Sequence, residues 1–272
     1  MISTFPYVCV FCRHPHPAYV GRCVACSKNN SVRLKGWEKE SHLQTPRELF
    51  IEKAKPMEYR AEPVPRILIG VENVDAAFGG GLAVGSANLL SGAEGAGKST
   101  LALRLLDENA MYASSEESRE QIEDRATRIG IVDASKMRGA PLLATHRVLN
   151  ALEEASALGV RLLILDSLHG FDGDPEINAR KIHRWCKGTG ATVIAIARLV
   201  KNNSIAGART IAYEFDAHVE IVCRQAKTAQ GEPLPIFHRT LVTRKNRFGP
   251  AGQWPLLLTE RGWENPEEET SP

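Results

Sequence analysis

The chain has 272 residues, of which 43% are hydrophobic, and this is enough apolar material for one α/β domain with a small addition. Its 34 Lys and Arg residues nearly balance its 32 Asp and Glu residues, so the net charge of +2 does not by itself indicate a nucleic-acid partner. Because the sequence has neither a long apolar run nor a basic, apolar start, we expect a cytoplasmic protein without a membrane partner. Collagens, coiled coils and porins are excluded.

Paired cysteines near the start of the chain suggest a metal site. In a reducing cytosol, two closely spaced pairs favour metal over disulfides, and four thiolates can enclose Zn²⁺ without leaving a position for a substrate. His14 and His16 lie between the pairs as alternative ligands, but we favour a closed four-cysteine site. A segment this short cannot bury a core of its own, so we predict a zinc-stabilised ribbon over residues 1–27. Its ligands would be Cys9, Cys12, Cys23 and Cys26.

Residues 28–64 are polar and proline-containing, and we interpret them as a linker. From residue 65 to residue 262, short apolar runs alternate with glycine-rich turns and amphipathic stretches, which predicts an α/β domain with a mostly parallel sheet. Residues 263–272 are acidic, and we expect them to form a disordered tail. The strands expected in the main domain are Ala87–Ser91, Ala110–Ser114, Arg161–Asp166, Thr192–Ala197, Ala217–Arg224, Ile236–Arg244 and Trp254–Thr259.

Helices are expected between these strands. Thr145 and Asp174 are predicted to cap two of them, and a third is predicted over Arg119–Ile129. Cys186 and Cys223 fall within the expected helix and strand patterns, so we interpret both as buried core thiols.

Residues 92–99 match the pattern G-x-x-x-x-G-K-[ST], with an apolar strand before them and a helix-like stretch after them. Glycines allow backbone N–H groups to turn toward phosphate, and the helix N-terminus adds a favourable partial charge. Lys98 would neutralise the β- and γ-phosphates of ATP, Ser99 would ligate Mg²⁺, and Glu94 is expected to point outward. The predicted nucleotide-binding residues are Gly92, Ala93, Glu94, Gly95, Ala96, Gly97, Lys98, Ser99 and Thr100.

Acidic residues follow two of the expected strands. Asp166 ends the apolar run Leu-Leu-Ile-Leu and is the candidate second residue for ordering Mg²⁺. Glu116 and Glu117 follow another strand, where a carboxylate can polarise an attacking water. An alternative interpretation is that both acids complement the dipole of the helix that follows them.

A basic segment extends from Arg224 to Arg247. It contains six basic residues and one acid, Glu232, so it is either a solvated face or a contact for nucleotide or nucleic acid. The basic residues are Arg224, Lys227, Arg239, Arg244, Lys245 and Arg247.

The order of these motifs resembles the RadA (Sms) family of bacterial DNA repair ATPases, which are RecA-like branch-migration factors. The resemblance implies a RecA-type core in which Lys98, Ser99 and Asp166 bind Mg·ATP and Glu116 is the catalytic carboxylate. It also implies that Lys245 and Arg247 serve a neighbouring subunit's nucleotide site or the DNA. The segments that carry it are YVCVFC with GRCVAC, GVENVDAAFGGGLAVGS, ASSEES, LLILDS, KNNSIAGAR and, most discriminating, KNRFG at Lys245–Gly249.

The sequence also departs from the family pattern. Glu94 stands where the family usually has proline, Arg198 where histidine is usual and Ala208 where proline is usual. Full-length members continue into a Lon-protease-like domain, which we expect this chain to lack. These departures concern turnover and DNA coupling more than nucleotide binding.

The resulting hypothesis is a DNA-stimulated ATPase that forms a ring or filament on single-stranded or branched DNA and promotes strand exchange or branch migration. A recombinase and a replicative helicase are candidate protein partners. Two alternatives remain open. One is a RecA/KaiC-class ATPase that regulates protein assembly without DNA, and the other is a truncated, non-catalytic paralogue that modulates a full-length relative.

Overall fold

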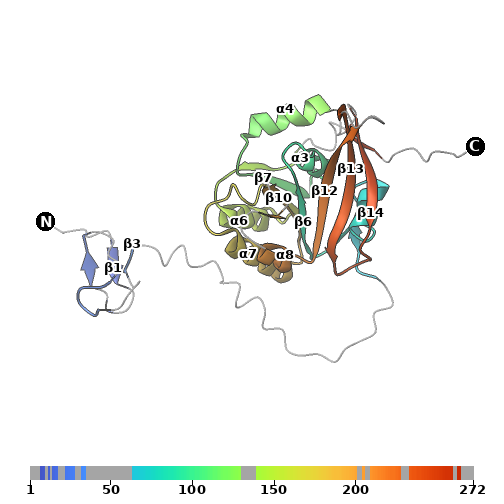
Figure 1. The fold of residues 1–272 in the computed structure, drawn as a ribbon. Coiled ribbons are helices and arrows are strands. Elements are labelled where there is room, and N and C mark those ends of the chain that lie inside the picture. The colour runs from blue at the N-terminus through green and yellow to red at the C-terminus, as the bar shows by residue number, and fades with distance from the viewer. Residues whose placement is uncertain are drawn as a thin grey trace, which may run out of the picture. The chain divides into compact units, whose positions relative to one another are not determined.

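The computed structural model describes residues 63–129, 139–200, 204–205, 209–227, 233–259 and 262–264 of the larger part of the chain. Near the start it describes residues 7–9, 12, 14–17, 22–27 and 32–34. Ala208, most of the predicted linker and residues 265–272 lie outside these ranges. The chain divides into two compact units, Met1–Met57 and Glu58–Pro272 (Figure 1).

The first unit contains a three-stranded antiparallel sheet. Its central strand is β1 (Tyr7–Cys9), flanked by β2 (Pro15–His16) and β3 (Val32–Leu34). Tyr7 pairs with His16 on one side and with Leu34 on the other. Because β3 completes this sheet, the ordered structure extends beyond the boundary predicted at residue 27.

The second unit is built on a ten-stranded sheet, which confirms the predicted mostly parallel α/β fold. Its parallel strands lie in the order β12-β6-β10-β9-β7-β8. In that order they are Ala217–Lys227, Ala87–Gly92, Thr192–Val200, Leu162–Asp166, Ala110–Ser114 and Leu142–Ala144.

Antiparallel strands extend the main sheet, and two more form a small separate sheet. Beyond β12 come β13 (Pro233–Asn246), β14 (Gln253–Thr259) and β15 (Gly262–Glu264). The short β11 (Ser204–Ile205) pairs with β10, while β4 (Arg66–Ile67) and β5 (Leu82–Ala83) form a separate two-stranded sheet. Trp263 is buried in strand β15, so the predicted start of the disordered tail at residue 263 is too early by at least two residues.

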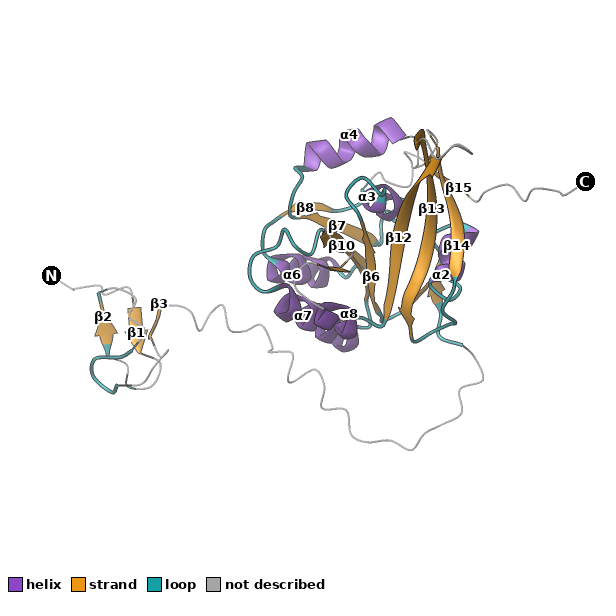
Figure 2. Cartoon of the chain, viewed as in Figure 1, coloured by secondary structure: helices purple, strands orange, loops and turns teal. Residues whose placement is uncertain are grey.

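Helices cover both faces of this sheet (Figure 2). One core cluster joins the sheet to α2 (Glu72–Ala77), α3 (Lys98–Leu103) and α4 (Arg119–Ile129). The other joins it to α6 (Val148–Leu158), α7 (Pro175–Thr189) and α8 (Arg209–Glu214). Ile164 belongs to the first cluster, whereas Leu163 and Leu165 belong to the second, because successive side chains of a strand point to opposite faces. This two-sided burial explains why the strand reads as an uninterrupted apolar run.

The predicted helix caps have different outcomes. Asp174 caps α7, where its carboxylate accepts hydrogen bonds from the backbone N–H groups of Glu176 (2.7 Å) and Ile177 (3.4 Å). Thr145 does not cap α6, because the capping position is Arg147, whose N–H group donates to the Thr145 hydroxyl at 3.2 Å.

The two core-thiol predictions also diverge. Cys186 is fully buried, as expected, whereas Cys223 is only partly buried.

Among the described helices, none has the length and apolar composition required to cross a bilayer.

Candidate functional site

The predicted phosphate loop connects β6 to α3. Gly95 and Gly97 have φ angles of +72° and +94°, a region that side chains disfavour. At Gly97 there is also no space, because a Cβ atom would lie 2.4 Å from the Trp263 ring. Trp263 Nε1 donates to the Gly97 carbonyl at 3.1 Å, so this side chain of β15 packs directly against the loop. The sequence interpretation missed this role because it assigned Trp263 to the tail.

Lys98 is buried at the first position of α3. Its Nζ donates to the carbonyls of Gly92 (2.9 Å) and Ala93 (2.7 Å), so its ammonium group lies over the loop. Burial lowers the pKa of Lys98, and the positive charge of Arg198 lowers it further, while the negative charge of Asp166 opposes both. A phosphate oxygen could replace these carbonyl contacts and would relieve the cost of keeping a cation in this position. Glu94 is exposed, as expected.

Asp166 ends β9 and lies beside β7, where it pairs in register with Ser114. Tyr112 donates its hydroxyl to Asp166 Oδ2. Burial, reinforced by the charge of Asp166, raises the pKa of Tyr112 well above its ordinary value, so the phenol remains a donor at neutral pH. Tyr112 thus orients the carboxylate predicted to help hold Mg²⁺, and the only sequence signal for it was its place on the strand before the two glutamates.

The side chains of Glu116 and Glu117 point in different directions and have different partners. The Ser114 hydroxyl accepts hydrogen bonds from both backbone N–H groups, at 3.2 and 2.9 Å. Glu117 then turns toward α4 and forms an ion pair with Arg125. Glu116 turns the other way, where its Oε1 accepts a hydrogen bond from the Ser167 hydroxyl at 2.5 Å. Of the two acids, Glu116 is therefore the one whose carboxylate lies beside Ser167, the residue that follows Asp166.

These side chains meet because the parallel strands end together. The predicted phosphate loop, residues 92–99 (the P-loop), follows β6, and Arg198 lies near the end of β10. Asp166 ends β9, and Glu116 follows β7. The four strands are consecutive neighbours in the sheet. A cavity of about 210 Å³ beside them is lined by Ser114, Ser115, Glu116, Glu117, Ser118, Ala144, Thr145 and His146. This edge of the sheet therefore brings together the Lys98 ammonium, the predicted phosphate-binding loop, and carboxylates of the kind that bind Mg²⁺.

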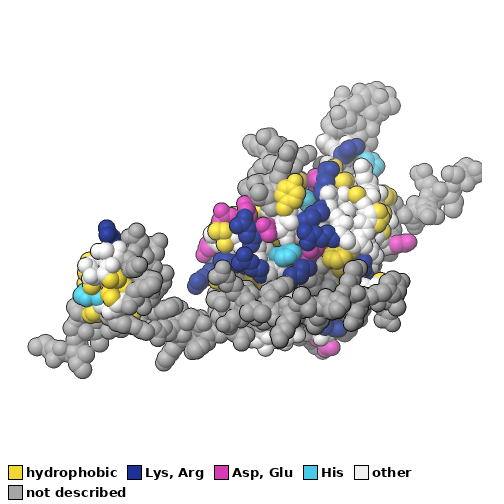
Figure 3. Space-filling model, turned by 90° about the horizontal axis from the view of Figure 1, so that it is seen from below, with side chains coloured by type: hydrophobic (Ala, Val, Ile, Leu, Met, Phe, Trp, Pro, Cys, Tyr) yellow, Lys and Arg dark blue, Asp and Glu magenta, His cyan; other side chains and the backbone are white. Residues whose placement is uncertain are grey.

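Lys245 and Arg247 lie at the opposite edge of the sheet. Asn246 pairs with Ala217, which in turn pairs with Asn88 near the start of β6, whereas the P-loop follows the other end of that strand. The structure therefore does not bring Lys245 and Arg247 to the P-loop of their own chain. Lys and Arg side chains gather on the face of the main domain that is seen from below in Figure 3.

Local contacts hold this basic pair. Lys245 Nζ donates to the carbonyls of Tyr213 (2.8 Å) and Phe215 (2.5 Å), and Arg247 pairs with the buried Asp216 at 2.7 Å. Lys187 contacts the other oxygen of Asp216 at 2.9 Å. Burial raises the pKa of Asp216, but the hydrogen bond from Lys187 and neighbouring groups outweighs burial, and the net effect lowers this pKa. The cluster should thus stabilise the fold above the ordinary pKa of Asp and lose its effect as the pH falls through the lowered value.

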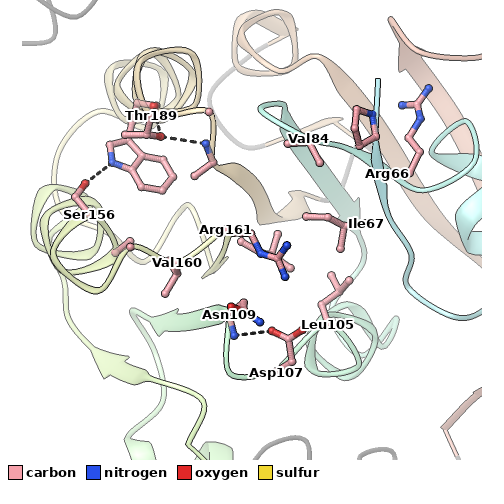
Figure 4. A pocket seen from close by; sticks show the side chains of 17 residues that line it. Arg66, Ile67, Val84, Leu105, Asp107, Asn109, Ser156, Val160, Arg161 and Thr189 are labelled. Carbon is pink, nitrogen blue, oxygen red and sulfur yellow. Dashed lines mark hydrogen bonds between the residues drawn. The ribbon is translucent and has the colours of Figure 1, made fainter. Parts of the chain in front are cut away.

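A larger cavity, of about 880 Å³, lies near the starts of β9 and β10 rather than at the phosphate loop (Figure 4). Its lining includes Val84, Arg161, Trp185 and the glycines that end α6 and α7. Trp185 Nε1 donates to the Ser156 hydroxyl at 2.8 Å, which fixes one wall. None of the predicted site residues lines this cavity.

The four predicted zinc ligands come together in the first unit. Their sulfur atoms all lie within 4.8 Å of one another, with separations of 3.6 Å for Cys9–Cys26 and for Cys12–Cys23. Among the residues described, this group contains cysteines alone, and His14 and His16 pack against each other with ring centroids 5.0 Å apart. Four converging thiolates suit a closed zinc site.

We expect the purified protein to carry about one zinc ion per chain, because a four-cysteine site closes around one ion. Cys12→Ser should reduce the zinc content and unfold the first unit, whereas the main domain should keep its thermal transition because it has its own core. Elemental analysis of chelator-free, reduced protein and calorimetry measure the two effects. Cys223→Ser, outside the cluster, is the control and should retain full zinc; a zinc-free unmodified protein contradicts the expectation.

Comparison with known proteins supports the sequence resemblance. No family model matches the chain. The DNA repair protein RadA of Aquifex aeolicus is 29% identical over 280 residues, which cover 96% of this chain and 60% of that protein. RadA of Escherichia coli is 26% identical over 288 residues, covering 94% of this chain and 58% of that protein. The chain thus spans about three fifths of the length of these curated relatives.

A solved structure of a KaiC-like protein from Pyrococcus horikoshii has a similar fold. It is 18% identical, with a TM-score of 0.60, and the match covers 74% of this chain and 99% of that protein. The expected RecA/KaiC-like fold is therefore confirmed, and the resemblance to RadA proteins extends over nearly the whole chain.

Proposed function

We propose that this chain is a RadA-like ATPase of the RecA class that acts in the cytoplasm on single-stranded or branched DNA during repair and recombination. The observation that carries this proposal is the meeting of Lys98, Asp166 and Glu116 at one edge of the sheet. The similarity to curated DNA repair proteins supports DNA as the partner. We expect strand exchange or branch migration to be the reaction that ATP hydrolysis drives.

Each residue at this edge has a distinct role in the proposed reaction. Lys98 exchanges the loop carbonyls for the β- and γ-phosphates, and the N–H groups of the loop hold the phosphate oxygens. Ser99 and Asp166 would hold Mg²⁺, with Tyr112 keeping the Asp166 carboxylate oriented. The ion, when bound, neutralises charge that develops on the phosphates. Glu116 orients a water for in-line attack and accepts its proton.

The position of Lys245 and Arg247 supports a role between subunits. Both residues lie at the edge opposite the P-loop of their own chain, so a head-to-tail arrangement of subunits can bring them to the next nucleotide site. Heterologous contacts of this kind close into rings or extend as filaments. We therefore propose a homo-oligomer with composite nucleotide sites, and a recombinase or replicative helicase as a candidate further partner.

Mixing two inactive variants tests the composite site. Lys98→Ala and Lys245→Ala proteins should each have low turnover, while about a quarter of randomly formed interfaces in an equal mixture contain both intact halves and should recover activity. ATPase assays and solution mass are measured in parallel. Arg224→Ala, which changes an exposed arginine in the same basic segment, is the matched control and should remain active alone.

Lys245 and Arg247 make contacts that can contribute to folding stability, so the stability of each variant must be measured alongside this test. Removing Lys245 also removes hydrogen bonds to the end of α8, so each variant's thermal transition should be measured before mixing. Arg247→Lys keeps the charge near Asp216 and provides a second, milder variant. A folded Lys245→Ala protein with normal turnover on its own would contradict the inter-subunit role.

DNA binding is tested by turnover with and without single-stranded DNA. Neutralisation of phosphates by Lys and Arg releases counterions, so binding should weaken steeply as salt increases. Stimulated turnover at low salt is the expected result. Normal turnover without any DNA binding would favour a RecA/KaiC-class ATPase that regulates protein assembly.

A further inference from the structure

Arg198 links the proposed catalytic glutamate to the phosphate loop. It lies near the end of the central strand β10, where its backbone pairs in register with Gly92, the first residue of the loop. Its guanidinium forms an ion pair with the Oε2 atom of Glu116, which follows β7, the second strand from β10 in the sheet, while the Ser167 hydroxyl donates to Oε1. Both oxygens of Glu116 are therefore engaged by the protein's own side chains.

The two side chains of this ion pair are exposed enough for Arg198 to leave Glu116 and bind another anion. The side chains of Arg198 and Glu116 are 47% and 33% exposed, so water and salt weaken the pair and it contributes little to folding stability. Arg198 is also close enough to Lys98 for its positive charge to lower the pKa of that lysine, after the larger effect of burial. Lys98 begins α3, and the backbone of Arg198 pairs with Gly92 at the start of the loop, so a terminal phosphate placed beside Lys98 would attract Arg198 away from Glu116.

We propose that Arg198 is a positioning residue that exchanges Glu116 for the terminal phosphate of a nucleoside triphosphate. The exchange frees one oxygen of Glu116 for the attacking water only when the terminal phosphate is present, while Ser167 keeps the carboxylate in place. Arg198 thereby distinguishes a triphosphate from a diphosphate. This inference rests on the proposed function, because it requires a nucleotide at the P-loop.

Equilibrium binding of two probes tests the exchange without requiring turnover. The probes are Mg²⁺ with a non-hydrolysable β,γ-imido analogue of ATP, and Mg²⁺ with ADP. Arg198→Ala should weaken binding of the triphosphate analogue about ten-fold, the usual effect of losing one charge-assisted hydrogen bond, and leave ADP binding unchanged. Arg198→Lys should restore part of the preference for the triphosphate, because a cation remains. Arg119→Ala, which removes an exposed arginine of α4, is the control and should change neither affinity.

A double-mutant cycle separates exchange from a passive contact. Glu116→Gln weakens the pair that Arg198 must leave, so it should strengthen binding of the triphosphate analogue several-fold in the otherwise unmodified protein. The same change should have no effect in the Arg198→Ala protein, because there is no guanidinium to release. A structural role for Arg198 would instead change ADP and triphosphate affinities together.

The outcomes are distinguishable. Equal effects of Arg198→Ala on both probes, or an equal effect of Glu116→Gln in both backgrounds, would overturn the exchange while leaving the nucleotide site intact. Failure of the unmodified protein to bind either probe would overturn the nucleotide site itself, and this inference with it.

Discussion

The Lys98→Ala protein is expected to lose nearly all binding of Mg·ATP, with affinity falling about 100-fold or more and turnover becoming undetectable. A charge-assisted hydrogen bond to phosphate contributes roughly 1.5–3 kcal/mol, and Lys98 is placed to make more than one. The fold should survive, since burial already disfavours the charged form of Lys98 and its removal takes away that cost. Calorimetric titration with nucleotide and thermal unfolding measure the two effects.

Lys181→Ala is the matched control for this prediction. Lys181 is a partly buried lysine of α7, on the helical layer formed by α6, α7 and α8, so its removal should leave nucleotide affinity unchanged. Retention of wild-type affinity by Lys98→Ala would mean that residues 92–99 are a glycine-rich turn without a phosphate-binding role.

Glu116→Gln is expected to bind Mg·ATP at least as tightly as the unmodified protein, and tighter if Arg198 is released as proposed above, and to lower turnover about 100-fold or more, which is the usual scale of general-base catalysis. The amide keeps the shape and the contact with Ser167 but cannot accept a proton from water. Single-turnover measurements at saturating nucleotide separate this loss from a change in affinity.

Glu117→Gln provides the internal comparison. The two glutamates are adjacent and have the same charge, but Glu117 forms a partly buried ion pair with Arg125 on α4 and does not contact Ser167, so its change should leave turnover nearly unchanged. A large loss in Glu117→Gln with normal turnover in Glu116→Gln would reverse the assignment of the catalytic acid.

Patterns confined to neighbouring residues were sufficient to predict the parallel core. The apolar run before Asp166 indicated a strand buried on both faces, and β9 covers Leu162–Asp166. Helix α4 occupies the predicted range Arg119–Ile129, and Asp174 caps α7. Such features depend on spacing within one element, so the sequence alone contains the information. The short elements α2, β8 and β15 carry too few residues for a periodic signal and were not predicted.

The sequence by itself determined the chemical inventory: a phosphate-type loop, acids at strand ends, and four cysteines spaced for one metal. Only the tertiary structure decided where these groups lie and which partners they contact. It turned Glu116 toward Ser167 and Glu117 toward Arg125, although the two acids share one local context. It brought Trp263 against Gly97, 166 residues away, and placed Lys245 at the edge opposite the P-loop. The physical reason is that an element forms from contacts within a few residues, whereas the direction and partner of a side chain depend on strands that meet only after the sheet is assembled.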